Sequence, residues 1–361
     1  MDSNLIYQEK DAFKIFIKDN SIVVEFSDNR NAITSSWLNG GYFEGISGVF
    51  NTSLSTQDII DMESMDFKEF LSLKSQKLGL NPSSSSALVT TAKMESYGLS
   101  IKRFEKLEVL AIVTAGVRYN SVSAGDLASF YEENGEYYSL EKGHLPKPGT
   151  INTIIIINSK LNESSLLLAM MTATEAKSVA LRNLVVPSFY SEEIATGTGT
   201  DGISIISNLD SDNLIDNAGK HSKLGELIAN ATIEAINISL AKGMYITPKT
   251  QAHVLVRLDR LKFDINEFYD SLDLNNPSKV KEKEKFIKDL AKASWDYKNI
   301  AITSSILNIL DEVRHGLMTK KIAYNLANSI VDNSISEDDL LDNGNKAIKE
   351  LLKFCISYYL N

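Results

Sequence analysis

The sequence is poor in the residues on which several common kinds of site depend. Its 361 residues include one cysteine, Cys355, which excludes an intrachain disulfide framework and a cysteine-rich metal site, and which fits a reducing compartment. Only four histidines occur, and no two have the helical spacing of metal ligands. A histidine-rich metal centre is therefore disfavoured, while a mixed site of histidine and carboxylates stays open.

Long apolar runs and an excess of positive charge are missing as well. No run approaches the roughly 20 apolar residues that cross a bilayer, and the start, MDSNLIYQEKDAF, lacks the basic and apolar regions of a secretory signal. Lys and Arg number 37 against 47 Asp and Glu, a net charge of -10, which argues against binding along a nucleic-acid backbone. We expect a cytoplasmic protein that acts on or binds a small molecule, with no nucleic-acid partner and no membrane association. A homo-oligomer stays open.

The patterns that are present predict alternating strands and helices. FKIFI (13–17) and IVVEF (22–26), joined by Asp-Asn, indicate an antiparallel hairpin. The elements expected further along are buried strands at 87–94, 107–116 and 153–158, a helix capped by Asn162 that runs to about Asn183, a strand around a glycine-rich bend at 194–207, and a helix whose apolar face spans Leu224 to Ile238. The polar, Tyr-rich stretch 125–149 is expected to be a surface loop.

These elements predict an α/β fold, with α+β as the alternative, in two parts. The first part, residues 1–246, is expected to be a catalytic domain with a layered mixed β-sheet and flanking helices. Parallel pairing is expected around 153–207, because an unbroken apolar strand suits a sheet covered on both faces. Residues 247–361, where glycine becomes scarce, are expected to form a helical C-terminal extension.

Two carboxylates stand at positions that suit chemistry. Glu175 lies in a helix of Leu, Ala, Met and Thr, which predicts a carboxylate shielded from water and suited to general acid/base work, unless Lys177 or Arg182 reaches it. A structural carboxylate that accepts from amides or an arginine is an equal alternative. Asp201 ends TGTGTD (196–201), a bend whose amides can cradle an anion. Taken alone, that string equally suits a tight β-bulge with Asp201 as its turn residue.

Other candidates stand beside element boundaries, and each has a structural alternative. His221 precedes a helix, where an imidazole can shuttle a proton or join a carboxylate at a metal. Glu226 lies in the first turn of that helix, where it would also stabilise the helix dipole. Asn39 and Gly40 suit an ordinary Asn-Gly turn. Thr114, at the end of a buried strand, can bond a ligand or form a turn, as can Asn120.

Taken together and in order, several strings resemble the adenosylcobinamide amidohydrolase family, which salvages incomplete corrinoids in archaea and some bacteria. The matching strings are SSWLNGG (35–41), TAG (114–116), GTIN (149–152), TATEAK (172–177), TGTGTD (196–201) and GKHSKLGELI (219–228). The resemblance covers about residues 10–260. It departs from the family at VRYNS (117–121), and the Tyr-rich insertion (126–146) and the helical tail look longer than the family core.

The resemblance implies hydrolysis of the amide between the aminopropanol arm and the corrin ring, which yields adenosylcobyric acid and 1-amino-2-propanol. No Gly-X-Ser-X-Gly string occurs and Cys355 is far from the matching strings, so a serine or cysteine nucleophile is disfavoured. We expect Glu175 or Asp201 to activate water, His221 or the same carboxylate to protonate the amine, and amides around 197–199 to hold the oxyanion. No cofactor and no bound metal are indicated, and the cobalt-containing corrinoid is the substrate.

The expected substrate contacts come from the matching strings. They are Asn39, Gly40, Thr114, Asn152, Lys177, Thr198, Gly199, Thr200 and Glu226. Aromatic side chains next to the strings, namely Trp37, Tyr42, Phe43 and Tyr119, are expected walls for the flat ring.

Three rival hypotheses stay open. In the first, Thr198 or Thr200 is the nucleophile and Asp201 or His221 is its base. In the second, the chain is a corrinoid-binding module without turnover. The third, a phosphate-binding protein that uses TGTGTD as an anion nest, is less favoured, because no Gly-Lys-Ser/Thr follows and the surroundings are acidic.

Overall fold

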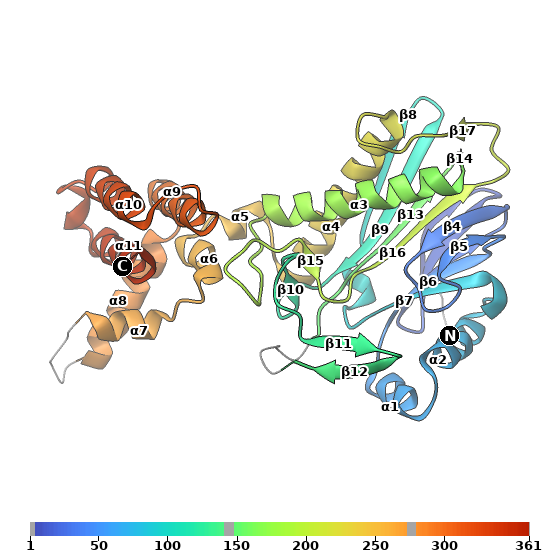
Figure 1. Ribbon diagram of the computed structural model, residues 1–361, viewed down its shortest axis with the longest axis horizontal. Helices are drawn as coiled ribbons and strands as arrows, with labels where there is room; N and C mark the ends of the chain where they lie inside the picture. Colours follow the sequence, from blue (N-terminus) through green and yellow to red (C-terminus); the bar gives the residue numbers. More distant parts are fainter. Residues whose placement is uncertain (1–3, 141–147, 273–278, 361) are drawn as a thin grey trace. The chain divides into compact units, whose positions relative to one another are not determined.

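The computed structural model describes residues 4–140, 148–272 and 279–360 (Figure 1). The chain divides into two compact units, Met1–Thr247 and Pro248–Asn361, one residue from the boundary expected at 246. Each unit has a hydrophobic core of its own. Among the described residues, no helix combines the length and the apolar character that crossing a membrane requires.

Two β-sheets form the middle of the first unit. The five-stranded sheet has the order β1 (Asn4–Glu9), β2 (Phe13–Lys18), β3 (Ser21–Phe26), β6 (Gly48–Ser53) and β7 (Ser85–Thr90). The six-stranded sheet has the order β5 (Gly41–Glu44), β4 (Arg30–Thr34), β16 (Gly202–Asn208), β13 (Ile151–Ile157), β9 (Leu107–Ala115) and β8 (Gly98–Phe104). Both sheets are mixed, because β6 and β7 pair in parallel, as do β13 and β16.

Helices cover the outer faces of these sheets. Strand β13 shows why the six-stranded sheet is apolar on both sides: Ile155 faces one core and Ile154 the other, because successive side chains alternate. The core around Ile155 includes α3 (Glu163–Asn183) and α4 (Lys223–Met244), and the core around Ile154 fills the space between the sheets. A further core joins the five-stranded sheet to α1 (Thr56–Ser64) and α2 (Phe67–Leu78). The first unit is thus layered helix, sheet, sheet, helix (Figure 1).

Short elements connect the layers. Three two-stranded pairs are β10 (Ser121–Val122) with β15 (Gly197–Thr198), β11 (Phe130–Glu133) with β12 (Glu136–Ser139), and β14 (Lys160–Leu161) with β17 (Leu214–Ile215). Two 3₁₀ turns, η1 (Pro82–Ser84) and η2 (Met94–Ser96), flank β7. The pair β10 and β15 ties the TGTGTD string to the segment after β9.

The structure confirms the α/β class and several expected elements. The hairpin of β2 and β3 turns at Asp19 and Asn20, both with positive φ, as a tight two-residue turn requires. Asn162 caps α3 by accepting from the amide of Ser165, and α3 ends at Asn183. The parallel pairing of β13 with β16 falls inside the expected range.

Two expectations about local structure are wrong. The strand expected at 87–94 is present as β7 but ends at Thr90, and a 3₁₀ turn begins at Met94. The surface loop expected at 125–149 contains the exposed hairpin of β11 and β12, since the Asn134-Gly135 pair adopts the positive φ values of a hairpin turn. Residues 141–147, the rest of that stretch before Pro148, lie outside the described residues.

The second unit is helical in its described part. Its helices are α5 (Pro248–Gln251), α6 (Val254–Leu258), α7 (Ile265–Ser271), α8 (Lys279–Ala293), α9 (Tyr297–Arg314), α10 (Lys320–Ser334) and α11 (Asn343–Leu360), with 3₁₀ turns η3 (Asp259–Leu261) and η4 (Asp339–Leu341). The core of this unit contains Cys355, which is fully buried. Burial raises the pKa of the Cys355 thiol to about 12, so the thiol is not a thiolate nucleophile near neutral pH.

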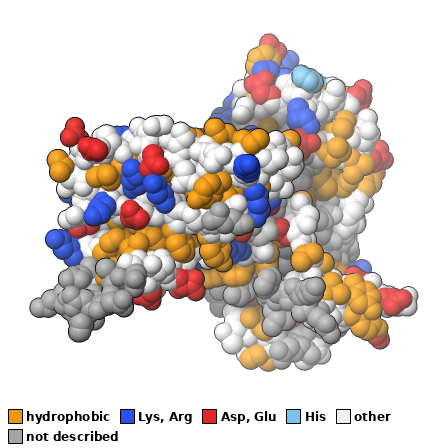
Figure 2. Space-filling view, turned by 60° about the vertical axis from the view of Figure 1, so that its left-hand side comes forward, with side chains coloured by type: hydrophobic (Ala, Val, Ile, Leu, Met, Phe, Trp, Pro, Cys, Tyr) orange, Lys and Arg blue, Asp and Glu red, His pale blue; other side chains and the backbone are white. Residues whose placement is uncertain are grey.

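Charges of both signs share the molecular surface. On the face drawn in Figure 2, the described Lys and Arg side chains lie scattered among Asp and Glu side chains rather than in one stripe. A scattered arrangement does not provide the row of cations that tracks a phosphate backbone.

Candidate functional site

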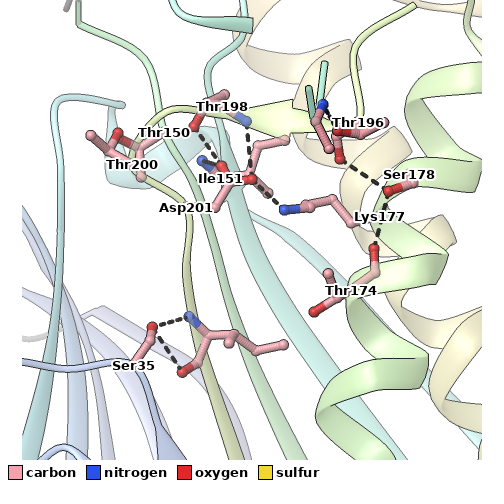
Figure 3. Close-up of polar contacts among 12 residues, drawn as sticks. Ser35, Thr150, Ile151, Thr174, Lys177, Ser178, Thr196, Thr198, Thr200 and Asp201 are labelled. Carbon is pink, nitrogen blue, oxygen red and sulfur yellow. Dashed lines mark hydrogen bonds and ion pairs between the residues drawn. The ribbon is translucent and has the colours of Figure 1, made fainter. Parts of the chain in front are cut away.

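Asp201 is the centre of a polar cluster at the beginning of β16 (Figure 3). Its carboxylate pairs with Lys177 of α3 and accepts the amide of Thr198 at 3.0 Å and the Thr198 hydroxyl at 2.5 Å. The amide of Ile151, at the start of β13, donates to Asp201 Oδ1 at 3.0 Å. The side chains of Lys177 and Asp201 are 16% and 14% exposed. A carboxylate has about four acceptor positions, so the protein's own donors occupy all of them.

A glycine makes room for this pair. A Cβ on Gly197 would lie 2.7 Å from Lys177 Nζ and would overlap Asp201 Oδ2. The backbone at Gly197 does not require a positive φ, so close approach is the reason for glycine there. The glycine-rich string therefore packs the loop against an ion pair.

Two threonine hydroxyls lie next to the Asp201 cluster. Thr150 Oγ1 and Thr200 Oγ1 are 2.7 Å apart, and Thr200 donates to the carbonyl of Gly149 at 3.0 Å. Asn120 donates to the same carbonyl at 2.7 Å and accepts from the hydroxyl of Tyr190 at 3.1 Å. Asn120 thereby connects the segment around Gly149 to the TGTGTD loop.

A buried amide network lies behind this edge, between the two sheets. Asn152 donates to Asn51 Oδ1 at 2.8 Å and to the carbonyl of Val89 at 2.9 Å. Asn51 in turn donates to Thr114 Oγ1 at 2.8 Å. Thr114 and Asn152 lie on β9 and β13 of the six-stranded sheet, whereas Asn51 and Val89 lie on β6 and β7 of the five-stranded sheet. The network therefore joins the two sheets at their shared end.

A cavity of about 720 Å³ opens at this end of the sheets. It lies where β4, β6 and β7 end and where β13 and β16 begin. Its polar wall contains Thr150, Asn152, Thr200 and Asp201. Its apolar wall contains Trp37, Leu54, Met62, Phe67 and Leu71. A concave site with a broad apolar wall and a few convergent polar groups is typical of small-molecule binding.

The apolar wall includes one of the four aromatic residues expected there. Trp37 is 66% exposed and stacks edge-on against Phe67, with ring centroids 6.0 Å apart. Tyr42, Phe43 and Tyr119 do not line this cavity. Phe43 packs between the sheets, and Tyr119 contacts Phe189. These three side chains are therefore not walls of this cavity.

Glu175 is not shielded from water, so that expectation is wrong. It lies on α3 two residues from Lys177, and residues so spaced on a helix face in nearly opposite directions. Its side chain is 49% exposed and pairs with Lys220 at 2.5 Å. The apolar neighbours that suggested shielding do not cover it, because Met171 is itself 59% exposed.

The start of α4 is also solvated. His221 is exposed in the turn before α4, and Ser222 caps the helix by accepting from the amide of Gly225. Glu226 lies in the first turn of α4, where it is exposed and pairs with Lys223 at 2.7 Å. Neither His221 nor Glu226 lines the cavity that contains Asp201.

Asn39 and Gly40 close a turn rather than line the cavity. Asn39 has positive φ and donates to the carbonyls of Pro82 and Ser85 at 2.8 and 2.7 Å. A Cβ on Gly40 would overlap the carbonyl oxygen of Ser36. These contacts place the neighbouring residues Ser35, Ser36 and Trp37 on the cavity wall.

Two of the amides expected to hold an oxyanion are already used. The Thr198 amide donates to Asp201, and the Gly199 amide donates to the carbonyl of Asn120 at 3.3 Å. Gly199 is exposed, and a Cβ on it would lie 3.2 Å from Asn120 Oδ1. The loop is thus a closed turn around Asp201 that also borders the cavity.

Sequence reasoning missed several residues of the cavity. Ser35 lies in SSWLNGG and Thr150 lies in GTIN, two of the strings that match the family. Their polar side chains could therefore have been predicted as part of the cavity wall. Met62, Phe67 and Leu71 come from α1 and α2, whose apolar residues do not differ in pattern from those of a core. Among the described residues, no three His, Cys, Asp or Glu side chains come together as a metal site would need.

The layers and the cavity define a class before any relative is considered. This is an α/β protein with a ligand-sized cavity and a carboxylate-lysine pair at the strand ends, which is the arrangement of a small-molecule enzyme or binding protein. A family model described as adenosylcobinamide amidohydrolase matches residues 5–248. The chain belongs to this family, and the match spans the first unit.

A curated relative is similar to part of the chain. The uncharacterized protein MJ1613 of Methanocaldococcus jannaschii is 32% identical over 182 residues, which cover 49% of this chain and 71% of the relative. Two solved structures are weakly similar. The PH0078 protein of Pyrococcus horikoshii has a TM-score of 0.32 and 13% identity, over 66% of this chain and 83% of that one. The L-aminopeptidase D-Ala-esterase/amidase of Ochrobactrum anthropi has a TM-score of 0.28 and 9% identity, over 68% and 83%. Neither structural likeness carries an argument about function.

Proposed function

We propose that the protein hydrolyses adenosylcobinamide at the amide between the corrin ring and the aminopropanol arm, in the salvage of corrinoids. The observation that carries the proposal is the cavity of about 720 Å³, which joins a broad apolar wall to Asp201. A flat macrocycle with amides at its rim needs apolar contact and amide partners, and Trp37 and Asn152 are of these two kinds.

Asp201 is the carboxylate that we propose activates water. Of its donors, the Thr198 hydroxyl can rotate away, whereas the two amides and Lys177 are held by the backbone and by the ion pair. A water that takes the place of this hydroxyl would donate to Asp201 Oδ1 and attack the carbonyl carbon. Asp201 would take the proton of the water and pass it to the nitrogen as the C–N bond breaks. This cleavage yields a carboxylic acid and an amine, and transfer of the proton of the acid to the amine then gives the carboxylate and the ammonium.

Lys177 would supply positive charge while the oxyanion forms. Its Nζ is held by Asp201, and preorganised charge in a partly buried site stabilises a developing anion. We assign no catalytic step to Glu175, His221 or Glu226, since all three side chains are exposed and Glu175 and Glu226 pair with Lys220 and Lys223 instead.

Thr198 is an alternative nucleophile. Its hydroxyl lies 2.5 Å from Asp201 Oδ1, and Asp201 is oriented by Lys177, which matches the logic of a nucleophile, its base and a third orienting group. Attack by Thr198 would leave a corrinoid ester on the protein. Quenching the reaction and measuring the mass of the intact chain distinguishes the two routes, because water attack leaves no adduct.

Incubation with adenosylcobinamide tests the function directly. We expect adenosylcobyric acid and 1-amino-2-propanol in equal amounts, measured by chromatography, with and without a chelator. We propose that no metal or cofactor beyond the corrinoid is required, and that the reaction takes place in the cytoplasm, where the single thiol stays reduced. Loss of product with the chelator would overturn the proposal that no metal is required. A change in the corrinoid spectrum without product would favour the corrinoid-binding module.

A further inference from the structure

A second cavity, of about 400 Å³, lies beside the first. Thr91 and the segment Pro148–Thr150 line both cavities, so this segment is the wall between them. The remaining boundaries of the second cavity are η2, the end of β9 and the end of α4. Every residue that lines it belongs to the first unit.

The wall between the cavities is thin and held from both sides. On one side, Thr150 Oγ1 contacts Thr200 Oγ1 at 2.7 Å. On the other side, the amide of Gly116 donates to the carbonyl of Thr150 at 2.9 Å. A Cβ on Gly149 would lie 3.0 Å from both Asn120 Cβ and the carbonyl oxygen of Gly116, so no larger residue fits there without a shift.

An amide substrate has a carbonyl side and a nitrogen side. In the proposed substrate the carbonyl side is the large one, and the two cavities likewise differ in size. If the large apolar part of the substrate fills the larger cavity with its carbonyl carbon next to Asp201, the nitrogen side must leave across the wall at Gly149 and Thr150. We propose that the second cavity is the leaving-group subsite, which holds the short polar amine arm of the substrate. This inference rests on the proposed function and specifies how the site divides its substrate.

The charges on the two cavities support this division. Among the residues that line each cavity, the charged ones are Asp201 in the larger cavity and Lys93 and Lys242 in the second. Lys242 Nζ donates to the carbonyl of Tyr97 at 2.9 Å and lies 4.4 Å from the centre of the Tyr97 ring. A neutral amide arm is compatible with two lysines. After hydrolysis the arm is an ammonium, and like charges then favour its release.

Two glycines set the width of the second cavity. A Cβ on Gly116 would have its nearest neighbours at 3.8 Å, which is ordinary contact, so a side chain there would enter the cavity without a clash. A Cβ on Gly243, in α4, would lie 3.1 Å from Ser96 Cβ. Substitution of either glycine should therefore restrict the arm and leave the larger cavity unchanged.

The first experiment compares amides of adenosylcobyric acid that carry 2-aminoethanol, 1-amino-2-propanol or a linear six-carbon amine. For Gly116→Val we expect kcat/KM to fall more with each longer arm, by about twofold for the shortest and about 10- to 100-fold for the longest. Gly243→Ala should give the same order with smaller losses. Leu54→Phe, which narrows the larger cavity, is the matched control and should affect all three arms equally.

The outcomes separate this inference from the proposed function. If the wild-type protein cleaves none of the three amides, the proposed function is wrong and the subsite assignment falls with it. If the wild-type protein cleaves them but Gly116→Val and Gly243→Ala reduce all arms equally, or reduce none, only the subsite assignment is wrong.

A second experiment tests the lysines. In the double variant Lys93→Gln/Lys242→Gln, we expect the inhibition constant of 1-amino-2-propanol to fall about three- to tenfold, because two charges no longer repel the ammonium. The inhibition constant of adenosylcobyric acid, the other product, should stay unchanged. An unchanged constant for 1-amino-2-propanol would contradict a subsite that contains both lysines.

Discussion

The inner and outer faces of α3 carry the same kind of ion pair in different surroundings. On the inner face, Lys177 meets Asp201, and these side chains are 16% and 14% exposed. On the outer face, Glu175 meets Lys220, and these side chains are 49% and 65% exposed. Glu175 and Lys177 are two residues apart in TATEAK, so the helical repeat alone separates them.

The difference shows that belonging to a motif does not by itself make a residue part of the site. An exposed ion pair is worth about 0–1 kcal/mol, because water and salt screen it. A largely buried pair interacts more strongly and is costly to break. Of these four side chains, only Asp201 lines the cavity. The string TATEAK therefore contributes to the cluster through Lys177 and its packing, while Glu175 remains on the surface.

Exchange of the two carboxylates for amides is the strongest test of this comparison. We expect Asp201→Asn to reduce kcat/KM about 100- to 10,000-fold, the range for the loss of a general base. Glu175→Gln, the matched control on the outer face, should retain activity within about threefold. Hydrolysis of adenosylcobinamide is the measurement. A large loss with Glu175→Gln and a small one with Asp201→Asn would reverse the assignment.

Removal of the inner cation should have the next largest effect. Lys177→Met leaves Asp201 largely buried without its partner, and we expect a loss of about 2 kcal/mol in the free energy of unfolding together with about 100-fold in kcat/KM. Lys220→Met, on the outer face, should change neither by more than about 0.5 kcal/mol or twofold. Urea unfolding and initial rates give both quantities. Equal effects of the two substitutions would contradict the comparison.

A steric change tests whether the inner pair depends on Gly197. In Gly197→Ala the added Cβ overlaps Asp201 Oδ2, so the ion pair must shift. We expect a loss of about 1–3 kcal/mol in the free energy of unfolding and about 10-fold in kcat/KM. Gly199→Ala, whose Cβ would lie 3.2 Å from Asn120 Oδ1, is the graded control and should cost less. A neutral Gly197→Ala would show that the loop can move away from the pair.

The smallest expected effect is a difference in how salt changes the coupling energies of the two ion pairs. A double-mutant cycle of Glu175→Gln with Lys220→Gln should give a coupling of at most about 0.5 kcal/mol, and 1 M salt should abolish it, since the Debye length is then about 3 Å. The cycle for Asp201 and Lys177 should keep most of its coupling at that salt concentration. Loss of both couplings at 1 M salt would mean that solvent reaches the inner pair as freely as the outer one.

Local sequence patterns were sufficient for elements whose cause is local. The Asp19-Asn20 turn and the Asn162 cap depend on backbone conformation and on a side chain within three residues, and both occur as expected. The apolar run of β13 predicted a strand covered on both faces, and its parallel partner β16 fell in the expected range. The hairpin of β11 and β12 was missed, because its residues are exposed on both faces and show no apolar alternation.

The sequence by itself determined the α/β class and the family. These depend on chain-local patterns and on ordered motifs, which a single chain displays. The tertiary structure decided which of two carboxylates meets the cavity, that α1 and α2 supply its apolar wall, and that a thin wall divides it from a second cavity. Such facts depend on which face of a helix packs inward and on contacts between residues far apart in the chain, and a linear pattern specifies neither.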